Sequence, residues 1–346
     1  MALVVLTDAC NLSCRACFRP RGPEQEAVPW SFSGLESCLD ELVSVGQRSV
    51  GYTGGEPSLW RDGEKTFPDL LAASSRLGLS VMFVTNGRPF RDYDSACAFL
   101  DRYFGLTQAS LRAIVSVDHW HDGTWADGRS PALESVLSWL EANADTNILE
   151  VEVASLWGLD DSHNIPLGEF ARYTEAGIKI SYVPLSPTGR AHALSELAPT
   201  LSAHGACKAS LGSYGQVLRQ QMGITEEDWS ELPNSELHGP CVAVTNLTLG
   251  LDRRYWLCND RAGEDLCVAP AGGLTAESID ACLERNPIVK SFLETSVADA
   301  IRESGDERGI LSPASAAAIL SRRHPYGVSG RASCGLCQHL PRECFS

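Results

Sequence analysis

Short apolar runs alternate with amphipathic segments along the first half of the chain, and this alternation limits the possible folds most strongly. The runs predicted as strands lie at 2–7, 48–54, 79–87, 111–118, 148–155 and 178–185. The segments predicted as helices lie between them, near 34–45, 66–77, 93–104, 131–144 and 166–176. Strands joined through helices form a parallel sheet with right-handed crossovers. We therefore predict an α/β fold, a partial (β/α)6 TIM-like barrel, because six units suit a partial barrel better than a closed eight-unit one.

Residues that carry chemistry follow the predicted strands, which is where functional side chains of such barrels gather. They are a cysteine loop at Cys10, then Gly54–Pro57, Thr85–Gly87, Ser116–Asp118 and Pro187–Arg190. We therefore expect one site at the carboxyl edge of the sheet.

The composition excludes several classes of protein. The 28 Lys and Arg against 44 Asp and Glu give a net charge of −16, which opposes unaided binding to nucleic acid or an anionic membrane. No apolar run approaches the roughly 20 residues of a membrane helix, and no secretion signal is recognisable. A cytoplasmic, reducing location is therefore expected, where the 13 cysteines of the chain favour metal ligands or catalytic thiols. The alternative is that most of them are small buried hydrophobic residues.

The spacing of the cysteines separates these two interpretations. Cys10, Cys14 and Cys17 form a Cys-x3-Cys-x2-Cys pattern. Three thiolates cannot complete a tetrahedral structural zinc site, which takes four ligands. They can hold an iron–sulfur cluster and leave one iron open to another ligand. This loop is therefore a candidate cluster site.

The remaining cysteines fall into pairs and single residues. Cys241 and Cys258 are separated by 16 residues, and Cys334 and Cys337 form a CxxC near the end of the sequence. Cys38 and Cys97 lie in amphipathic segments and are expected in the core. No role is assigned from spacing to the other four, Cys207, Cys267, Cys282 and Cys344.

The three-cysteine loop after the first strand and Gly-Gly-Glu-Pro after the second together resemble the radical S-adenosylmethionine (SAM) superfamily, over about residues 1–190. The resemblance implies that Cys10, Cys14 and Cys17 hold a [4Fe–4S] cluster. Its open iron binds the amino and carboxylate groups of SAM. Reductive cleavage of SAM then gives a 5′-deoxyadenosyl radical that abstracts a hydrogen atom from the substrate.

The resemblance also assigns cofactor contacts by motif position. Gly54, Gly55, Glu56 and Pro57 would contact the methionine ammonium, with the glycines allowing close backbone approach and Glu56 either supplying charge or bracing the turn. Further SAM neighbours would be Thr85 and Asn86, with Ser116 and Asp118 at the ribose and Arg190 after the sixth strand. For Arg190, a surface salt bridge is the alternative. One departure is that Ala16 stands where many members have an aromatic residue, and Phe18 follows the third cysteine instead.

The paired cysteines resemble the C-terminal SPASM or twitch extension of this superfamily. The expected organisation is a radical SAM barrel at 1–190, a helical bridge at 191–240 and a smaller Fe–S domain at 241–346. Cys241, Cys258, Cys334 and Cys337 would hold one auxiliary [4Fe–4S] cluster, in preference to two clusters or a zinc site. Such a cluster can accept an electron from a substrate radical, which favours a net two-electron oxidation over a redox-neutral outcome.

Acid–base residues are expected near the mouth of the barrel. His119 and His121 follow the fourth strand and suit proton transfer near neutral pH, with helix capping or solvent exposure as the alternative. Glu150 and Glu152 share one face of the fifth strand, and either the barrel lumen or an exposed sheet edge would suit them. Glu152 is the carboxylate we expect to be catalytic.

The sequence leaves three functions open. We expect first an enzyme that oxidatively modifies or cross-links an unactivated C–H position in a ribosomally made peptide. The alternatives are a small-molecule dehydrogenase or tailoring enzyme for an amino sugar or natural product, and a non-catalytic metal-binding scaffold. A flavodoxin or ferredoxin would supply electrons. Because one strand alone precedes Cys10, a separate protein would supply peptide recognition.

Overall fold

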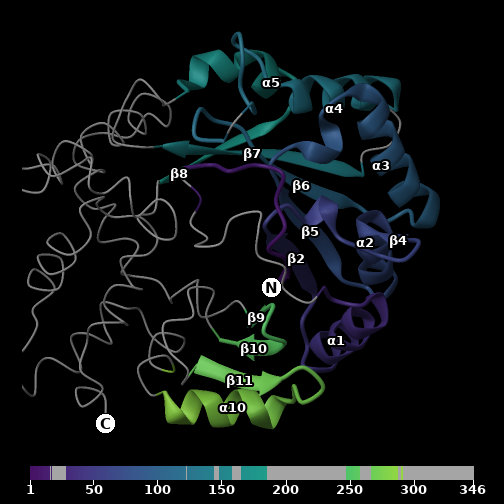
Figure 1. Ribbon diagram of the computed structural model, residues 1–346, viewed down its shortest axis with the longest axis vertical. Coiled ribbons are helices and arrows are strands. Elements are labelled where there is room, and N and C mark those ends of the chain that lie inside the picture. Colours follow the sequence, from purple (N-terminus) through teal and green to yellow (C-terminus); the bar gives the residue numbers. More distant parts are fainter. Residues whose placement is uncertain are drawn as a thin grey trace, which may run out of the picture. The chain divides into compact units, whose positions relative to one another are not determined.

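The computed structural model describes residues 1–15, 17, 29–121, 123–143, 148–157, 165–184, 247–257, 266–286 and 290 (Figure 1). The chain divides into two compact units. The first comprises Met1–Leu194 and Leu249–Arg253, and the second comprises Ser195–Thr248 and Arg254–Ser346.

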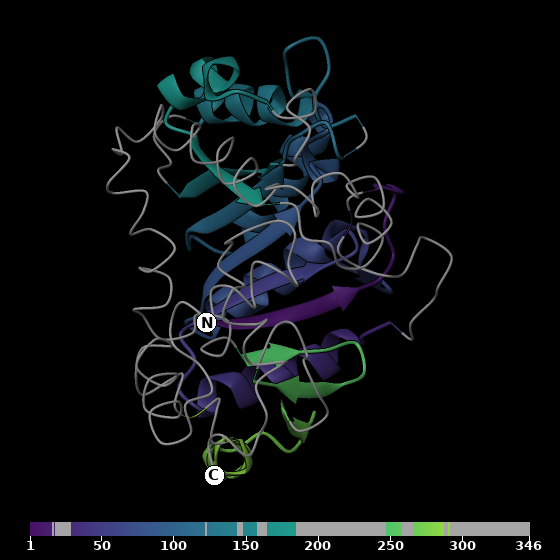
Figure 2. The ribbon, with the colours of Figure 1, turned by 90° about the vertical axis from the view of Figure 1, so that its left-hand side faces the viewer.

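The first unit is built on a parallel sheet whose strands follow the chain order, β1-β2-β5-β6-β7-β8. The strands are β1 (Ala2–Thr7), β2 (Ser49–Gly54), β5 (Ser80–Thr85), β6 (Leu111–Ser116), β7 (Leu149–Trp157) and β8 (Lys179–Pro184). Every neighbouring pair in this series is parallel. Figure 2 shows the strands following one another from purple to teal. This arrangement confirms the predicted α/β fold with a partial (β/α)6 barrel.

The α-helices of this unit connect the strands, and α1 to α4 lie along one side of the sheet (Figure 1). Their bounds are α1 (Phe32–Ser44), α2 (Phe67–Arg76), α3 (Tyr93–Leu106), α4 (Pro131–Ala142) and α5 (Ala171–Glu175). Polar side chains begin two of them: Ser31 accepts a hydrogen bond from the Gly34 amide at 3.1 Å, and Asp92 accepts one from the Ser95 amide at 2.8 Å. Such caps satisfy amides that have no partner within the helix.

Short elements depart from the predicted pattern. The helix expected at 166–176 is a 3₁₀ turn, η4 (Leu167–Phe170), followed by the short α5. Gly168 lies inside that turn, and glycine weakens an α-helix by about 1 kcal/mol relative to alanine. A hairpin of β3 (Arg61–Asp62) and β4 (Lys65–Thr66) turns at Gly63, whose φ is +57°. Two further 3₁₀ turns are η1 (Pro57–Leu59) and η2 (Arg88–Phe90).

Aromatic side chains fill the layer between the sheet and the helices. Phe83 of β5 packs against Phe67 of α2 and Phe99 of α3, with ring centroids 5.4 and 5.5 Å apart. Alternate residues of β5 are buried, so Met82 and Val84 lie on the opposite face of the sheet. Through the strand register, Ser116 and Glu152 also belong to that second face. The helix-covered face therefore supplies the aromatic core, whereas the second face carries Ser116 and Glu152 beside apolar residues such as Met82 and Val84.

The described part of the second unit is small. Strand β10 (Arg254–Trp256) pairs antiparallel with β11 (Cys267–Pro270), and α10 (Ala276–Arg285) follows. Leu247 and Thr248 of strand β9 (Leu247–Leu249) also belong to this unit. No helix in the described segments is long and apolar enough to cross a membrane.

Candidate active site at the carboxyl edge of the sheet

The candidate site begins where β1 ends. Cys10 and Cys17 are half-buried and Cys14 is buried, and the Cys17 amide donates a hydrogen bond to the Cys14 carbonyl at 3.3 Å. Because neighbouring parallel strands end at the same edge, the residues after β2, β5 and β6 lie on that side of the sheet too. Within the described ranges, no three His, Cys, Asp or Glu side chains converge closely enough to hold a metal ion.

The two glycines after β2 pack against the backbone that leads into the cysteine loop. The Gly55 amide donates to the Thr7 carbonyl at 2.6 Å, and the Glu56 amide donates to the Ala9 carbonyl at 2.7 Å. A Cβ atom would lie 2.3 Å from the Thr7 oxygen if placed on Gly54, and 2.1 Å from the Ala9 oxygen if placed on Gly55. The close approach that these glycines permit is therefore to residues 7–9 of the chain itself.

Glu56 braces the ends of two strands. Its carboxylate is completely buried and accepts hydrogen bonds from the Ser58 amide at 3.1 Å, the Thr85 hydroxyl at 2.9 Å and the Asn86 amide at 2.8 Å. Burial raises the pKa of Glu56, and these hydrogen bonds offset part of that rise. Of the two roles considered for this side chain, the structure shows the bracing one. Pro57 is buried and begins η1.

Asn86 connects this brace to the cysteine loop. Its side-chain oxygen accepts a hydrogen bond from the Arg88 amide at 3.1 Å. Its Nδ2 donates to Oδ1 of Asn11 at 2.9 Å and to Sγ of Cys10 at 3.7 Å. Thr85 is buried, with its hydroxyl directed at Glu56. The structure therefore places Asn86 beside the first cysteine.

Asp118 organises the loop after β6. Its carboxylate has no exposed surface and accepts hydrogen bonds from the Trp120 and His121 amides, both at 2.8 Å, and from the Leu156 amide of β7 at 3.0 Å. The carboxylate thus already has partners within the protein, rather than facing outward toward a ribose. Ser116, at the end of β6, is half-buried on the second face of the sheet.

The two histidines after β6 have different surroundings. Nδ1 of His121 lies 2.9 Å from the carboxylate of Asp118, and 21% of the His121 side chain is exposed. Such a carboxylate holds a proton on Nδ1 and leaves Nε2 as the acceptor. His119 is exposed. The geometry therefore favours His121 over His119 as a proton acceptor.

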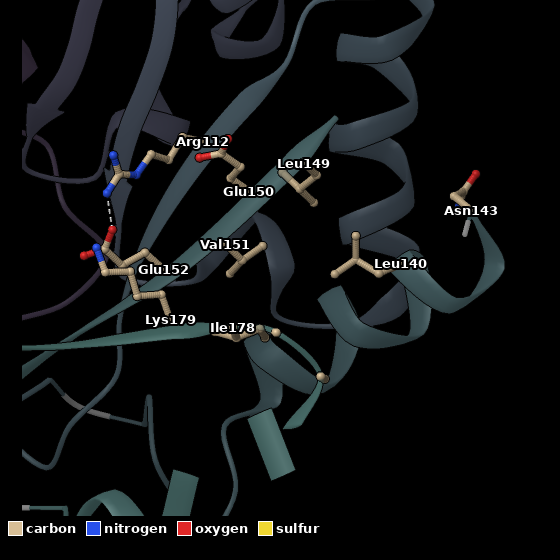
Figure 3. Close-up of a pocket in the computed structure, with 11 residues that line it drawn as sticks. Arg112, Leu140, Asn143, Leu149, Glu150, Val151, Glu152, Ile178 and Lys179 are labelled. Atoms are coloured by element: carbon tan, nitrogen blue, oxygen red, sulfur yellow. Dashed lines mark hydrogen bonds and ion pairs between the residues drawn. The ribbon is translucent and has the colours of Figure 1, made fainter. Parts of the chain in front are cut away.

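Glu152 lies in a charged group on the second face of the sheet (Figure 3). It pairs with Arg112 of β6 and accepts a hydrogen bond from Ser181 of β8. Burial opposes its ionisation, but Ser181, Arg112 and the charge of Lys179 together hold the pKa of Glu152 below its usual value. A general base needs a pKa near the working pH, so an ionised, paired Glu152 suits a structural or binding role better.

The pocket in Figure 3 lies at the opposite edge of the sheet from the cysteine loop. Its lining includes Arg112, Leu149, Glu150, Glu152 and Lys179 near the amino ends of β6 to β8, and Ile178 just before β8. Parallel barrels carry chemistry at the carboxyl ends of their strands. The pocket is therefore separate from the candidate site.

The described cysteines outside the three-cysteine loop differ in burial. Cys38 is buried in α1, which confirms its expected core position, whereas Cys97 of α3 is half-buried. Cys282 is buried in α10, where burial raises its thiol pKa, and Cys267 is half-buried at the start of β11. The predicted sites outside the described residues are Ala16, Phe18, Arg190, Cys207, Cys241, Cys258, Cys334, Cys337 and Cys344.

Curated proteins resemble parts of this chain, although no protein-family model matches it. GTP 3',8-cyclase of Shewanella denitrificans is 37% identical over 117 residues, 33% of this chain and 31% of the cyclase. The S-adenosylmethionine-dependent nucleotide dehydratase of Lacinutrix mariniflava is 31% identical over 91 residues, 25% of this chain and 18% of the dehydratase. PqqA peptide cyclase of Xanthomonas oryzae pv. oryzae is 31% identical over 85 residues, 25% of this chain and 22% of that cyclase. The matched part of the chain thus spans less than a third of the length of each of these relatives.

Solved structures share the fold. Native anSMEcpe with bound AdoMet and Kp18Cys peptide aligns with a TM-score of 0.54 and 12% identity, over 85% of this chain and 82% of that one. The same protein with bound AdoMet aligns with a TM-score of 0.51. In these partial matches and in its fold the chain is similar to radical SAM enzymes. Its three-cysteine loop is the motif on which the superfamily resemblance was based, and its parallel sheet is the fold predicted from the alternating strands and helices.

Several contacts at the candidate site were not predicted from the sequence. Asn11, Thr124 and the Leu156 amide contribute hydrogen bonds to the candidate site. Arg112 and Ser181 surround Glu152. Arg112 and Ser181 could have been found from the sequence, because each is a polar residue at an alternate position of an apolar strand. Such a position places the side chain on the second face of the sheet.

Proposed function

We propose that this chain is a radical SAM enzyme that oxidatively modifies or cross-links a C–H position of a ribosomally made peptide. The observation that carries the proposal is the three-cysteine loop after β1, held against the Gly54–Pro57 turn and Asn86. The likeness to PqqA peptide cyclase supports a peptide substrate.

Three thiols from one short loop are the donor set of an iron–sulfur cluster with an open iron. Cys10, Cys14 and Cys17 supply thiol ligands from one short loop, and amide donors of Leu12 and Asn86 lie 3.5 and 3.7 Å from the Cys10 sulfur. Hydrogen bonds of this kind stabilise cluster thiolates. The loop would close around the cluster as it binds, because ligand sites form together with their metal.

The chemistry divides between cofactor and chain. When bound, the cluster and SAM supply the 5′-deoxyadenosyl radical that abstracts a hydrogen atom from the substrate. The chain supplies His121, whose Nε2 takes the proton that the substrate radical releases when it is oxidised. Asp118 orients the imidazole and also fixes the loop to β7. We place SAM beside Gly54, Gly55 and Asn86, with Ser116 toward the ribose.

The C-terminal cysteines complete the proposal. Cys241, Cys258, Cys334 and Cys337 would hold an auxiliary [4Fe–4S] cluster, which supplies an electron acceptor, and a flavodoxin or ferredoxin would supply the reducing electron. We expect about eight irons per chain after anaerobic reconstitution. Cys334→Ala should retain SAM cleavage but lose product. Normal product yield from this variant would contradict the relay role.

The test of the proposed function is anaerobic reconstitution, followed by measurement of 5′-deoxyadenosine and mass spectrometry of candidate peptides encoded beside the gene. We expect 5′-deoxyadenosine and a peptide lighter by two hydrogen atoms. A chain that binds iron but never cleaves SAM would contradict the enzyme proposal and favour a non-catalytic scaffold.

A second candidate is a small-molecule tailoring enzyme. It is favoured by the matches to GTP 3',8-cyclase and to a nucleotide dehydratase, whose names give nucleotide substrates. In this case a nucleotide or amino sugar, rather than a peptide, would stimulate 5′-deoxyadenosine formation. Measuring 5′-deoxyadenosine formation with a peptide and with a nucleotide or amino sugar therefore distinguishes the two candidate functions.

A further inference from the structure

We propose that Asn86 sets the reduction potential of the cluster on Cys10, by donating a hydrogen bond to the thiolate. This inference rests on the proposed cluster site. It gives Asn86 an electronic role in addition to the neighbourhood of SAM expected from the sequence.

The orientation of the Asn86 side chain is fixed from one end. Its Oδ1 accepts a hydrogen bond from the Arg88 amide at 3.1 Å, which is an Asx turn. The opposite end of the amide is therefore Nδ2, a donor. That end faces Oδ1 of Asn11 at 2.9 Å and Sγ of Cys10 at 3.7 Å. The hydrogen bond from the Arg88 amide therefore orients Nδ2 of Asn86 toward the Cys10 sulfur without involving the sulfur itself.

The backbone of Asn86 is fixed from a second direction. Its amide donates to the buried carboxylate of Glu56 at 2.8 Å, and the Thr85 hydroxyl donates to the same carboxylate at 2.9 Å. The next residue, Gly87, has φ of +87°, and a Cβ atom there would lie 2.8 Å from Cβ of Ala132. The strand end that carries Asn86 is therefore held in one conformation before any cofactor binds.

The sulfur of Cys10 accepts N–H donors from two separate segments of the chain. The Leu12 amide lies 3.5 Å from its sulfur and comes from the loop itself, whereas Asn86 reaches it from β5. Hydrogen bonds to cluster sulfurs are among the determinants of reduction potential. Donors stabilise the more negative, reduced cluster, so they raise its potential. Loss of the Asn86 donor should therefore make the cluster harder to reduce.

The test compares Asn86→Ser with Asn143→Ser in the full, reconstituted chain. Serine can still accept from the Arg88 amide but is too short to reach Cys10, and it adds no charge. Asn143 ends α4, where its amide donates to the Trp139 carbonyl, and it serves as the matched control. Potentials are measured by redox titration followed by electron paramagnetic resonance. The signal that changes on addition of SAM identifies the cluster on Cys10.

We expect a lower midpoint potential for Asn86→Ser, with that of Asn143→Ser equal to the wild-type value. A tenfold weaker reduction equilibrium would appear as a shift of about 59 mV for one electron. Asn86→Asp, which replaces the donor by a charge, should lower the potential further. An unchanged potential in both Asn86 variants would overturn the inference. Loss of the cluster from both Asn86 variants would also overturn the inference, since Asn86 would then be needed for the structure of the cysteine loop and not for the potential. If the wild-type chain holds no such cluster, the proposed function fails first.

Discussion

Asp118 and His121 form a carboxylate–imidazole pair in which Nδ1 of the ring lies 2.9 Å from Oδ1 of the acid. The pair is three residues apart in sequence, and it is anchored to the neighbouring strand through the Leu156 amide. The carboxylate therefore determines which ring nitrogen remains available to a substrate.

Asp118→Asn should disturb this pair at the level of the ring tautomer. In the variant, the NH2 group of asparagine replaces one carboxylate oxygen and faces N–H groups that need an acceptor. These unsatisfied donors should lower the free energy of unfolding by about 1–3 kcal/mol. ¹⁵N NMR of labelled histidine should show Nδ1–H for His121 in the wild type and a changed tautomer ratio in the variant. Asp92→Asn, at the exposed start of α3, is the control. An unchanged tautomer in Asp118→Asn would show that the pair does not direct the ring.

His121→Gln should lower product formation by about 100- to 10,000-fold, the usual contribution of a positioned acid or base. SAM cleavage without product should persist, since proton removal follows hydrogen abstraction. The measurement is the ratio of product to 5′-deoxyadenosine. His119→Gln is the matched control, because His119 is exposed. A larger product loss in His119→Gln than in His121→Gln would reverse the assignment.

Glu56→Gln should change how stability depends on pH. Burial raises the pKa of Glu56 above its ordinary value of 4.5, so the folded state binds this proton more tightly than the unfolded chain does. The wild type therefore loses stability as the pH rises from 4.5 through the folded-state pKa. The glutamine variant lacks this loss, although its buried amide costs about 1–3 kcal/mol at every pH. Urea unfolding across that pH range measures the free energy of unfolding of both proteins. If it changed with pH equally in the wild type and the variant, the expected effect of the Glu56 pKa would be contradicted.

Glu152→Gln should act with the opposite sign. Despite its burial, the Ser181 and Arg112 hydrogen bonds and Lys179 hold the pKa of Glu152 below 4.5 in the folded state. Its contribution to stability is complete above 4.5 and is lost as the pH falls through the folded-state pKa. The variant should therefore lose less stability on acidification than the wild type. Urea midpoints at decreasing pH test this, and an equal loss in both proteins would contradict it.

Cys14→Ala should abolish SAM cleavage and reduce the iron content from about eight to about four per chain. Cys38→Ala is the matched control, because Cys14 and Cys38 are both buried but only Cys14 belongs to the proposed ligand set. The control should bind the full iron complement and form 5′-deoxyadenosine at the wild-type rate. SAM cleavage by Cys14→Ala would refute the ligand assignment.

Periodicity along the chain was sufficient to predict the fold of the first unit. The apolar runs became β1, β2 and β5 to β8 of the parallel sheet, because a strand buried on one face needs alternate apolar residues. The five-residue α5 is shorter than predicted, since Pro166 and Gly168 are poor residues for extending a helix toward its start. Residues that follow strands also came together at one edge, as parallel topology requires.

Contacts between strand ends were harder to predict. Glu56 contacts Asn86, which is 30 residues away in sequence, and Asp118 contacts Leu156, which is 38 residues away. Whether two such residues touch depends on strand register and loop path, which a single sequence does not display. The same reason explains why Glu152 was expected to be catalytic, although register places Lys179 beside it and Arg112 reaches it from β6.

The packing of Gly54 and Gly55 against Thr7 and Ala9 affects how mutational scans of this chain should be interpreted. A side chain at either glycine would displace the backbone that delivers the cysteines, before any cofactor is met. Loss of SAM binding in Gly54→Ala or Gly55→Ala would thus report on the shape of an internal scaffold. Contacts to SAM at this turn have to be mapped by chemistry that leaves both glycines in place, such as isotope labelling of their carbonyl carbons.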